Sequence, residues 1–367
     1  MQPDLIKNHD LLMGVDTLSV SSKSNKHFDK EKYPYIYNTV SRSANGDIYN
    51  YRINPDKYDK SRAKSDLGIY DFTEYSEIMK KIFEKTVLDE PRKTRIDLRF
   101  DSFSENSFEK MLKLNKFFVL LVAHSENLKN KYQSKDPVEL WDLTVCVGNH
   151  AIELENYNKA LQEPTGAVTN RLEARSKRLP DTPEELKEQT AWLQWKAIFR
   201  RATTRNNLDG FLKRVNNNLI RIFPTYRYEQ MTKTNHNGEI LKEKSFEYIL
   251  NQFILTYRNT LYTQKQIIAL IQELKRGEAA EKGESCQDFT KYARAKYKYL
   301  KDNYPFDLYT LQNVKDYLKK LSETADLFFG NGVILDTIPK QPTLTNPSKQ
   351  QGKVEITQSN MLQIRTQ

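Results

Sequence analysis

The sequence predicts an α+β protein, with an antiparallel-rich sheet domain followed by a mainly helical C-terminal region. Short segments that alternate between apolar and polar residues recur over the first 180 residues, which is typical of half-buried strands. From Pro180 onward the apolar residues recur at helical spacing instead. We therefore expect a sheet domain at 1–180, a helical region at 181–338 and a disordered tail at 339–367, where large apolar residues are few.

Local patterns predict the elements of the first part in order. Residues 94–103, TRIDLRFDSF, alternate strictly, which places Ile96, Leu98 and Phe100 together on the core side of a strand. Two other segments carry apolar residues at helical spacing. We expect strands at 14–20, 47–55, 94–103, 139–149, from Ile152 through Tyr157 and at 171–178, a turn at Gly148-Asn149, and helices at 72–87 and at 107–128 with Ser107 as its N-cap.

The helical region begins with a recognisable start signal. Thr182 and Glu185 have the spacing of a capping box, in which a hydroxyl and a carboxylate satisfy the first backbone N–H groups of a helix. Helices are expected from there to about residue 329. Breaks are expected at 224–243 and at 276–285.

Composition excludes several classes of protein. The longest apolar run, at 117–123, is too short to cross a bilayer, and the N-terminus lacks the pattern of a secretion signal. Cys146 and Cys286 form no CxxC pair, which argues against a disulfide framework or a zinc ribbon and favours the reducing cytoplasm. The net charge of +10 and the pI of about 9.2 favour a polyanionic partner such as nucleic acid, although many basic proteins bind nothing specific.

The other side of the 94–103 strand carries alternating charges, Arg95, Asp97, Arg99 and Asp101. Such charges pair across neighbouring strands as a solvated ladder. The alternative is a site for Mg²⁺ or Mn²⁺, which bind carboxylate oxygens together with substrate phosphate. A third carboxylate from another strand distinguishes the two, and Glu173 and Asp16 are the candidates. No two of the five histidines lie two residues apart, so a pair of histidine ligands on one strand is not expected.

Three motifs occur in a fixed order: RIDLRFD at 95–101, YNK at 157–159 and RLE at 171–173. Together with GVDTLSV at 14–20 and YRINPDKY at 51–58, they resemble the core motifs of trans-acting rolling-circle replication initiators of small plasmids. Relaxases of conjugative elements share that core. The resemblance covers roughly residues 14–178 and rests on the order and spacing of the motifs.

The resemblance implies a sheet-based nicking domain, usually dimeric, that cuts one strand at a plasmid's double-strand origin and loads a host replicative-type helicase. It implies that Tyr157 is the nucleophile and that Mg²⁺ or Mn²⁺ binds Asp97, Asp101, Glu173 and Asp16. One departure stands out, since Glu155 occupies a position where the family often has a basic residue.

A tyrosine with an unperturbed pKa of about 10 is a weak nucleophile at neutral pH, and a nearby cation activates it. Attack by Tyr157 would leave a 5′-phosphotyrosine and a free 3′-hydroxyl. Lys159, two residues later on the same strand face, is expected to contact the phosphate, or else to be a solvated lysine. Tyr157 is one of 21 tyrosines, so the alternative is a structural residue at a sheet edge.

Basic residues cluster in the first part of the predicted helical region. Arg and Asn side chains read guanine and adenine edges in the major groove, and both are frequent between Trp195 and Arg221. A solvated basic helix face is the alternative. The residues expected to bind DNA are Arg171, Arg175, Arg200, Arg201, Arg205, Lys213 and Arg214.

A second basic segment, 289–304, carries an apolar helical stripe, Phe289, Ala293, Tyr297 and Leu300, which indicates core packing. Its basic residues, Lys291, Arg294, Lys298 and Lys301, are expected on another face, where they would meet phosphates or solvent. Tyr292 and Tyr299 are candidates for stacking on bases.

The sequence thus predicts a cytoplasmic, homodimeric initiator of rolling-circle replication that binds double-stranded and single-stranded origin DNA and has no membrane contact. Two alternatives stay open. One is a relaxase for conjugative transfer on the same core. The other is a DNA-binding regulator on the same fold that lacks the chemistry, which Glu155 beside the tyrosine favours.

Overall fold

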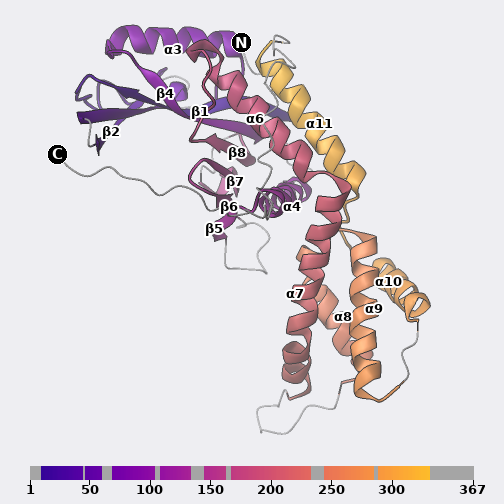
Figure 1. The fold of residues 1–367 in the computed structure, drawn as a ribbon. Coiled ribbons are helices and arrows are strands. Elements are labelled where there is room, and N and C mark those ends of the chain that lie inside the picture. Colours follow the sequence, from indigo (N-terminus) through magenta and orange to yellow (C-terminus); the bar gives the residue numbers. More distant parts are fainter. Residues whose placement is uncertain are drawn as a thin grey trace, which may run out of the picture. The chain divides into compact units, whose positions relative to one another are not determined.

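The computed structural model describes residues 10–43, 46–59, 68–103, 108–133, 144–162, 167–232, 244–284 and 288–330. All of them belong to one unit, Met1–Gly332. An antiparallel sheet occupies the N-terminal half and helices make up most of the C-terminal half, which confirms the predicted α+β class (Figure 1). The predicted tail at 339–367, Ser107 and Cys286 lie outside the described residues.

The sheet has eight strands in the order β2-β3-β1-β4-β8-β7-β6-β5, and every neighbouring pair is antiparallel. Strands β1, β4, β8 and β7 are central, and three of them carry the motifs 95–101, 157–159 and 171–173. Neither β2 nor β5 was expected from the sequence. The strands are β1 Leu11–Ser22, β2 Ile36–Ser43, β3 Gly46–Ile53, β4 Arg92–Ser102, β5 Lys129–Gln133, β6 Val145–Gly148, β7 Ile152–Asn158 and β8 Asn170–Ser176.

Helices cover one face of the sheet. Helix α4 packs on β6, β7 and β8, α6 packs on β4, and α11 packs on β1 (Figure 1). Among the described residues, every helix is too short or too polar to span a bilayer. The helices are α3 Phe72–Thr86, α4 Phe108–Glu126, α5 Lys159–Gln162, α6 Lys187–Ala202, α7 Arg205–Met231, α8 Phe246–Thr256, α9 Gln264–Glu281, α10 Thr290–Asn303 and α11 Leu311–Phe328, with short 3₁₀ turns η1 Pro55–Lys57, η3 Glu184–Leu186 and η4 Arg258–Thr260.

Strand β4 has the core side that its alternation predicts. Ile96, Leu98 and Phe100 are buried, and the Phe100 ring lies 5.7 Å from the ring of Trp192 on α6. Because side chains alternate along a strand, Arg95, Asp97, Arg99 and Asp101 face away from the helices, whereas Lys93 at the start of β4 binds Glu188 on α6. The opposite face of the sheet is therefore where the polar motif residues gather.

Helices α7 to α10 form a bundle with a hydrophobic core of their own, which includes Leu219, Phe253 and Leu270. The predicted break at 224–243 starts later than expected, since α7 continues through Pro224 to Met231 and α8 begins at Phe246. Phe223 is buried in the bundle core while Pro224 is exposed, so packing of the preceding turn outweighs the lost backbone hydrogen bond.

The second predicted break, at 276–285, also starts later than expected, and the predicted capping box is wrong. Helix α9 continues past 276 to Glu281, because nothing crowds Gly277 and Ala279 is buried beyond it. No capping box forms at Thr182, whose hydroxyl donates instead to the Pro180 carbonyl at 3.5 Å. The chain enters α6 through the 3₁₀ turn η3, which has Pro183 at its N-cap and no side-chain cap.

Candidate active site

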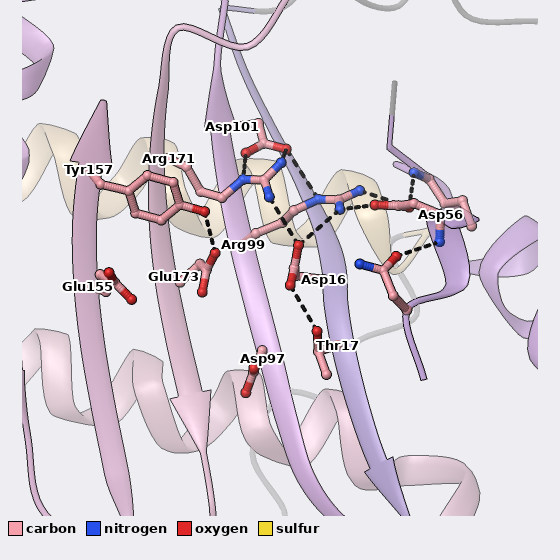
Figure 2. A network of polar contacts seen from close by, with 12 residues as sticks. Asp16, Thr17, Asp56, Asp97, Arg99, Asp101, Glu155, Tyr157, Arg171 and Glu173 are labelled. Carbon is pink, nitrogen blue, oxygen red and sulfur yellow. Dashed lines mark hydrogen bonds and ion pairs between the residues drawn. The ribbon is translucent and has the colours of Figure 1, made fainter. Parts of the chain in front are cut away.

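Polar side chains form three rows across the face of β7, β8 and β4 that points away from α4 and α6; we call this surface the polar face. Strand register sets the rows, because directly paired residues on antiparallel strands lie side by side. Figure 2 shows the side chains converging from separate strands. The rows are Tyr157, Arg171 and Asp101; Glu155, Glu173 and Arg99; and Glu153, Arg175 and Asp97.

Tyr157 points across the face to the next strand (Figure 2), where its hydroxyl donates a 2.6 Å hydrogen bond to Oε1 of Glu173. Burial raises the pKa of Tyr157 above its usual range, and the negative charge of Glu173 raises it further. Burial also raises the pKa of Glu173, with a contribution from Asp16, although Arg175 and Arg171 oppose it. At neutral pH the phenol of Tyr157 therefore keeps its proton and donates a short hydrogen bond to Glu173.

Arg171 lies beside Tyr157 and joins two carboxylates. Its Nε and Nη2 donate to the two oxygens of Asp101 at 2.6 and 3.0 Å, and its Nη1 donates to Asp16 Oδ1 at 3.0 Å (Figure 2). Asp101 is fully buried and also accepts from the Tyr70 hydroxyl at 2.9 Å. Both Asp101 oxygens are therefore held by protein donors.

Arg99 is 1% exposed, and its guanidinium fills the space between β1 and the η1 turn (Figure 2). Asp56 accepts from both of its terminal nitrogens, and its Nε lies 3.1 Å from Asp101 Oδ2. Gly14 and Gly68 leave the room, since a Cβ at Gly68 would lie 1.7 Å from Nη2 and one at Gly14 3.1 Å from Nε. A larger residue at Gly68 would collide with the guanidinium, and at Gly14 a Cβ would lie 2.5 Å from the Ile69 carbonyl oxygen, so both positions favour glycine.

Asp56 was not predicted as a site residue. It follows Asn54-Pro55, where the Asn54 side chain accepts from the Asp56 backbone N–H at 3.1 Å and starts η1. Its Oδ1 accepts from the Ile69 backbone N–H at 3.0 Å. The signal in the sequence was a strand that ends in Asn-Pro-Asp, a pattern of side-chain-capped turns that orients the following carboxylate.

Arg175 binds three glutamates at once, two in the second row and one in the third. Its Nη2 lies 2.6 Å from Glu173 Oε2 and also contacts Glu155, and its Nη1 contacts Glu153. Glu155 and Glu173 are directly opposite on β7 and β8, where two carboxylates would repel without a shared cation. The departure at Glu155 is thus matched by Arg175, which sequence reasoning had assigned to DNA.

Glu153, which sequence reasoning did not single out, has the most cationic surroundings of the three. Lys131 and Lys177 contact its Oε2, the latter at 2.5 Å, and Arg175 contacts its Oε1. Burial alone would raise its pKa, but hydrogen bonds from these three cations outweigh it and lower the pKa to about 2.

All four carboxylates predicted as metal ligands lie on or beside the polar face, and each is bonded to an arginine. The pairs are Asp97 with Arg95 at 2.6 and 2.7 Å, Asp101 and Asp16 with Arg171, and Glu173 with Arg175. In the described part of the chain, no three of the four bring their oxygens within 4.8 Å of one another. A different group, Cys146, Glu153 and Glu155, has its sulfur and carboxylate oxygens within 4.8 Å of one another.

The donors nevertheless suit Mg²⁺ or Mn²⁺ in type. These ions bind through one or two carboxylates and complete their shell with water and substrate phosphate, so a three-carboxylate cage is not required. Asp16 keeps 21% of its side chain exposed. Burial alone would raise the Asp16 pKa, but Arg171 and Arg99 outweigh it and lower the pKa, which keeps this carboxylate ionised.

Lys159 does not continue the strand face as expected. Strand β7 ends at Asn158, and Lys159 is the first residue of α5. Its charge still reaches the site, because it contributes to lowering the pKa of Asp16. The chain turns there because the Lys159 and Ala160 backbone N–H groups both donate to the Thr169 carbonyl just before β8.

The remaining predicted DNA-binding residues lie on helices and not on the polar face. Arg201 is bound by both oxygens of Glu126 at 2.5 Å, and Arg205 lies 3.8 Å from Asp209. Arg200, Lys213 and Arg214 are exposed on α6 and α7. Of the asparagines nearby, Asn216 is buried and donates to the Gln266 carbonyl, whereas Asn217 and Asn218 are exposed.

No family model and no curated protein matches this chain. Among solved structures, a rolling circle replication initiator protein from Geobacillus stearothermophilus is similar at 13% sequence identity, with a TM-score of 0.29. The match covers 54% of this chain and 90% of that one. A TM-score this low carries no argument about fold or function.

Proposed function

We propose that this protein starts rolling-circle replication of a plasmid by nicking one strand of the double-strand origin through Tyr157. The motif order RIDLRFD, YNK, RLE supports it from the sequence. The observation that carries the proposal is the 2.6 Å hydrogen bond from the Tyr157 hydroxyl to Glu173, a nucleophile paired with a base.

In the proposed reaction the phenolic oxygen of Tyr157 forms a bond to the scissile phosphorus while its proton passes to Glu173. The bond from phosphorus to the 3′-oxygen breaks, and that oxygen takes up a proton and leaves as a 3′-hydroxyl. The product is a 5′-phosphotyrosine. Its phosphodiester energy is conserved, so the reverse attack by a 3′-hydroxyl rejoins the strand without ATP. Burial raises the pKa of Glu173, which makes it a better proton acceptor than an ordinary glutamate.

Asp16, which keeps 21% of its side chain exposed, would hold the Mg²⁺ or Mn²⁺ ion, while Glu173 serves as the base for Tyr157. Such an ion, when bound, polarises a phosphoryl oxygen. Asp97 and Asp101, the other two carboxylates predicted for the ion, keep Arg95 and Arg171 in place in this proposal. Arg171 and Lys159 would then contact the phosphate that is cut.

Origin duplex would bind elsewhere, on the exposed cations at the end of α6 and the start of α7. All five predicted residues there are exposed: Arg200, Lys213 and Arg214 would bind directly, and Arg201 and Arg205 would exchange their carboxylate partners for phosphate. A homodimer and a host replicative-type helicase are further parts of the proposal, supported by the motif resemblance.

The test is a denaturing gel of supercoiled DNA from the protein's own replicon, incubated with the protein and Mg²⁺ or Mn²⁺. Wild type is expected to give a nicked strand with protein attached to its 5′ end. Tyr157→Phe should lower the amount of this product by at least about a thousandfold, because the variant lacks the proposed nucleophile. The matched control is Tyr299→Phe, an exposed tyrosine on α10, which should nick like wild type. Full activity of Tyr157→Phe would rule out the assignment.

A second candidate is a DNA-binding regulator that keeps this fold without the chemistry. Tyr157 is 6% exposed, and every predicted metal ligand is already bonded to an arginine, which is what a purely structural polar face requires. Origin binding with no nick under either metal would favour this candidate. A covalent adduct in wild type, absent from Tyr157→Phe, would exclude it.

A further inference from the structure

Four cations lie on one face of α10: Lys291, Arg294, Lys298 and Lys301. Their spacing of three, four and three residues keeps them on one side of a helix, and all four are exposed. Ala293, Tyr297 and Leu300 on the other side are buried in the core of the α7–α10 bundle. We call the exposed side the α10 stripe.

In the described part of the chain, no carboxylate lies within 4.0 Å of any cation of the α10 stripe. The nearest electrostatic link is weaker, since Arg294 contributes to the lowered pKa of Asp288. The neighbouring helices differ. On α9, Lys275 and Lys282 both bind Glu278, and on α11 Lys319 lies 3.4 Å from Glu323. Some surface lysines are thus paired, whereas the α10 stripe gathers four exposed cations on one side of a single helix, which leaves a positive surface there.

The stripe has the length and chemistry of a phosphate-binding surface. From Lys291 to Lys301 a helix advances about 15 Å, and duplex DNA carries one charge for about every 1.7 Å of its axis. Lysines bind phosphates as point charges, and no amide side chain lies among the four to read a base edge. The exposed face of α7 differs, because Asn217 and Asn218 lie between its cations there.

An anionic membrane fits the stripe less well. A helix that binds a lipid surface inserts its apolar face between the lipids, and the apolar face of α10 is already packed in the bundle core. Tyr292 also favours a contact with the DNA backbone over stacking on bases. Tyr292 donates to Glu247 at 2.5 Å and has Lys275 over its ring, so it is turned into the bundle, whereas Tyr299 is 48% exposed.

We propose that the α10 stripe binds the phosphate backbone of duplex DNA without reading its sequence. It would add affinity, while the origin would be recognised elsewhere. The choice of DNA as the polyanion rests on the proposed function, but the stripe's role does not require that Tyr157 cut anything.

The experiment measures duplex binding by fluorescence anisotropy from about 50 to about 200 mM salt, the range in which counterion release dominates. The protein carries Tyr157→Phe, so cleavage cannot interfere. The stripe variant replaces Lys291, Arg294, Lys298 and Lys301 with Gln. The control replaces four exposed lysines on α3 and α11, Lys80, Lys81, Lys315 and Lys319, with Gln, and so has the same net charge.

The slope of log K against log salt should fall by about 2 to 4 in the stripe variant, since each lost phosphate contact removes about 0.9. Affinity should fall equally, on the order of tenfold or more, for origin duplex and for a scrambled duplex. The control should keep the wild-type slope. An unchanged slope in the stripe variant, or a loss confined to origin duplex, would overturn the proposal.

Two further arms separate this inference from its alternatives. If vesicles of phosphatidylserine bind wild type but not the stripe variant, and duplex binding is the same in both, the partner is lipid and the inference is wrong. Nicking is measured in parallel with Tyr157 intact. A changed salt slope without nicking in wild type would leave the stripe as a DNA contact while the proposed function fails.

Discussion

The polar face of the sheet and the α10 stripe are both rich in charge, and they handle it in opposite ways. On the polar face the charges are buried and each carboxylate has an arginine or lysine partner, as with Asp101 and Arg171. On the α10 stripe the cations are exposed and have no carboxylate within 4.0 Å among the described residues. An unpaired charge is destabilising when it is buried, whereas an unpaired charge in contact with water has little effect on stability. The exposed cations can meet an outside polyanion without first giving up an ion pair, whereas Arg171 would have to exchange or share its carboxylate partners.

The sharpest way to break this comparison is to remove one partner from each region. Arg171→Leu should lower the free energy of unfolding by about 3–5 kcal/mol, because it leaves the buried Asp101 carboxylate uncompensated. Arg294→Leu, the same change on the α10 stripe, should alter it by less than about 0.5 kcal/mol. Urea unfolding at neutral pH measures both. Equal losses in the two variants would mean that pairing on the polar face has no special weight.

Titration of Glu153 gives a smaller effect with a definite sign. Its folded pKa of about 2 lies below the unfolded value of 4.5, so its contribution is present above pH 4.5 and is lost as pH falls toward 2. Wild type should lose up to about 2–3 kcal/mol of unfolding free energy from this group over that range. Glu153→Gln, measured by urea unfolding between pH 5 and pH 3, should show a shallower loss. If unfolding free energy falls with pH equally in wild type and variant, Lys131, Lys177 and Arg175 do not stabilise the ionised Glu153.

The smallest expected effect lies on the α10 stripe itself. Lys298→Glu reverses an exposed charge that forms no ion pair with any residue the structure describes, so the unfolding free energy should change by less than about 0.5 kcal/mol. The matched variant is Lys275→Glu on α9, which breaks the bond to the buried Glu278 and places two carboxylates together. It should cost more than Lys298→Glu in the same urea titration. The reverse order would contradict the contrast between paired and unpaired lysines.

The local sequence pattern was sufficient to predict an element where apolar residues repeat at a fixed period. The alternation of 94–103 determines which side of β4 is core, and apolar spacing predicts the helix at 72–87, which the structure has as α3 Phe72–Thr86. Its Asp71 N-cap, which accepts from Glu74 N–H at 2.8 Å, was not predicted. Pattern failed where packing outweighs a local signal. Pro224 lies inside α7 because Phe223 is buried in the bundle core, and the spacing of Thr182 and Glu185 produced no cap.

By itself the sequence determined the α+β class, the core side of the central strand and the identity of the residues that share the polar motifs. Only the tertiary structure decided their partners. Register across β7, β8 and β4 places Tyr157 next to Arg171 and directs its hydroxyl to Glu173. The strand order β3-β1-β4 brings Asp56, in the turn after β3, onto Arg99. Strand order and register depend on contacts between segments far apart in the chain, so no period within one segment encodes them.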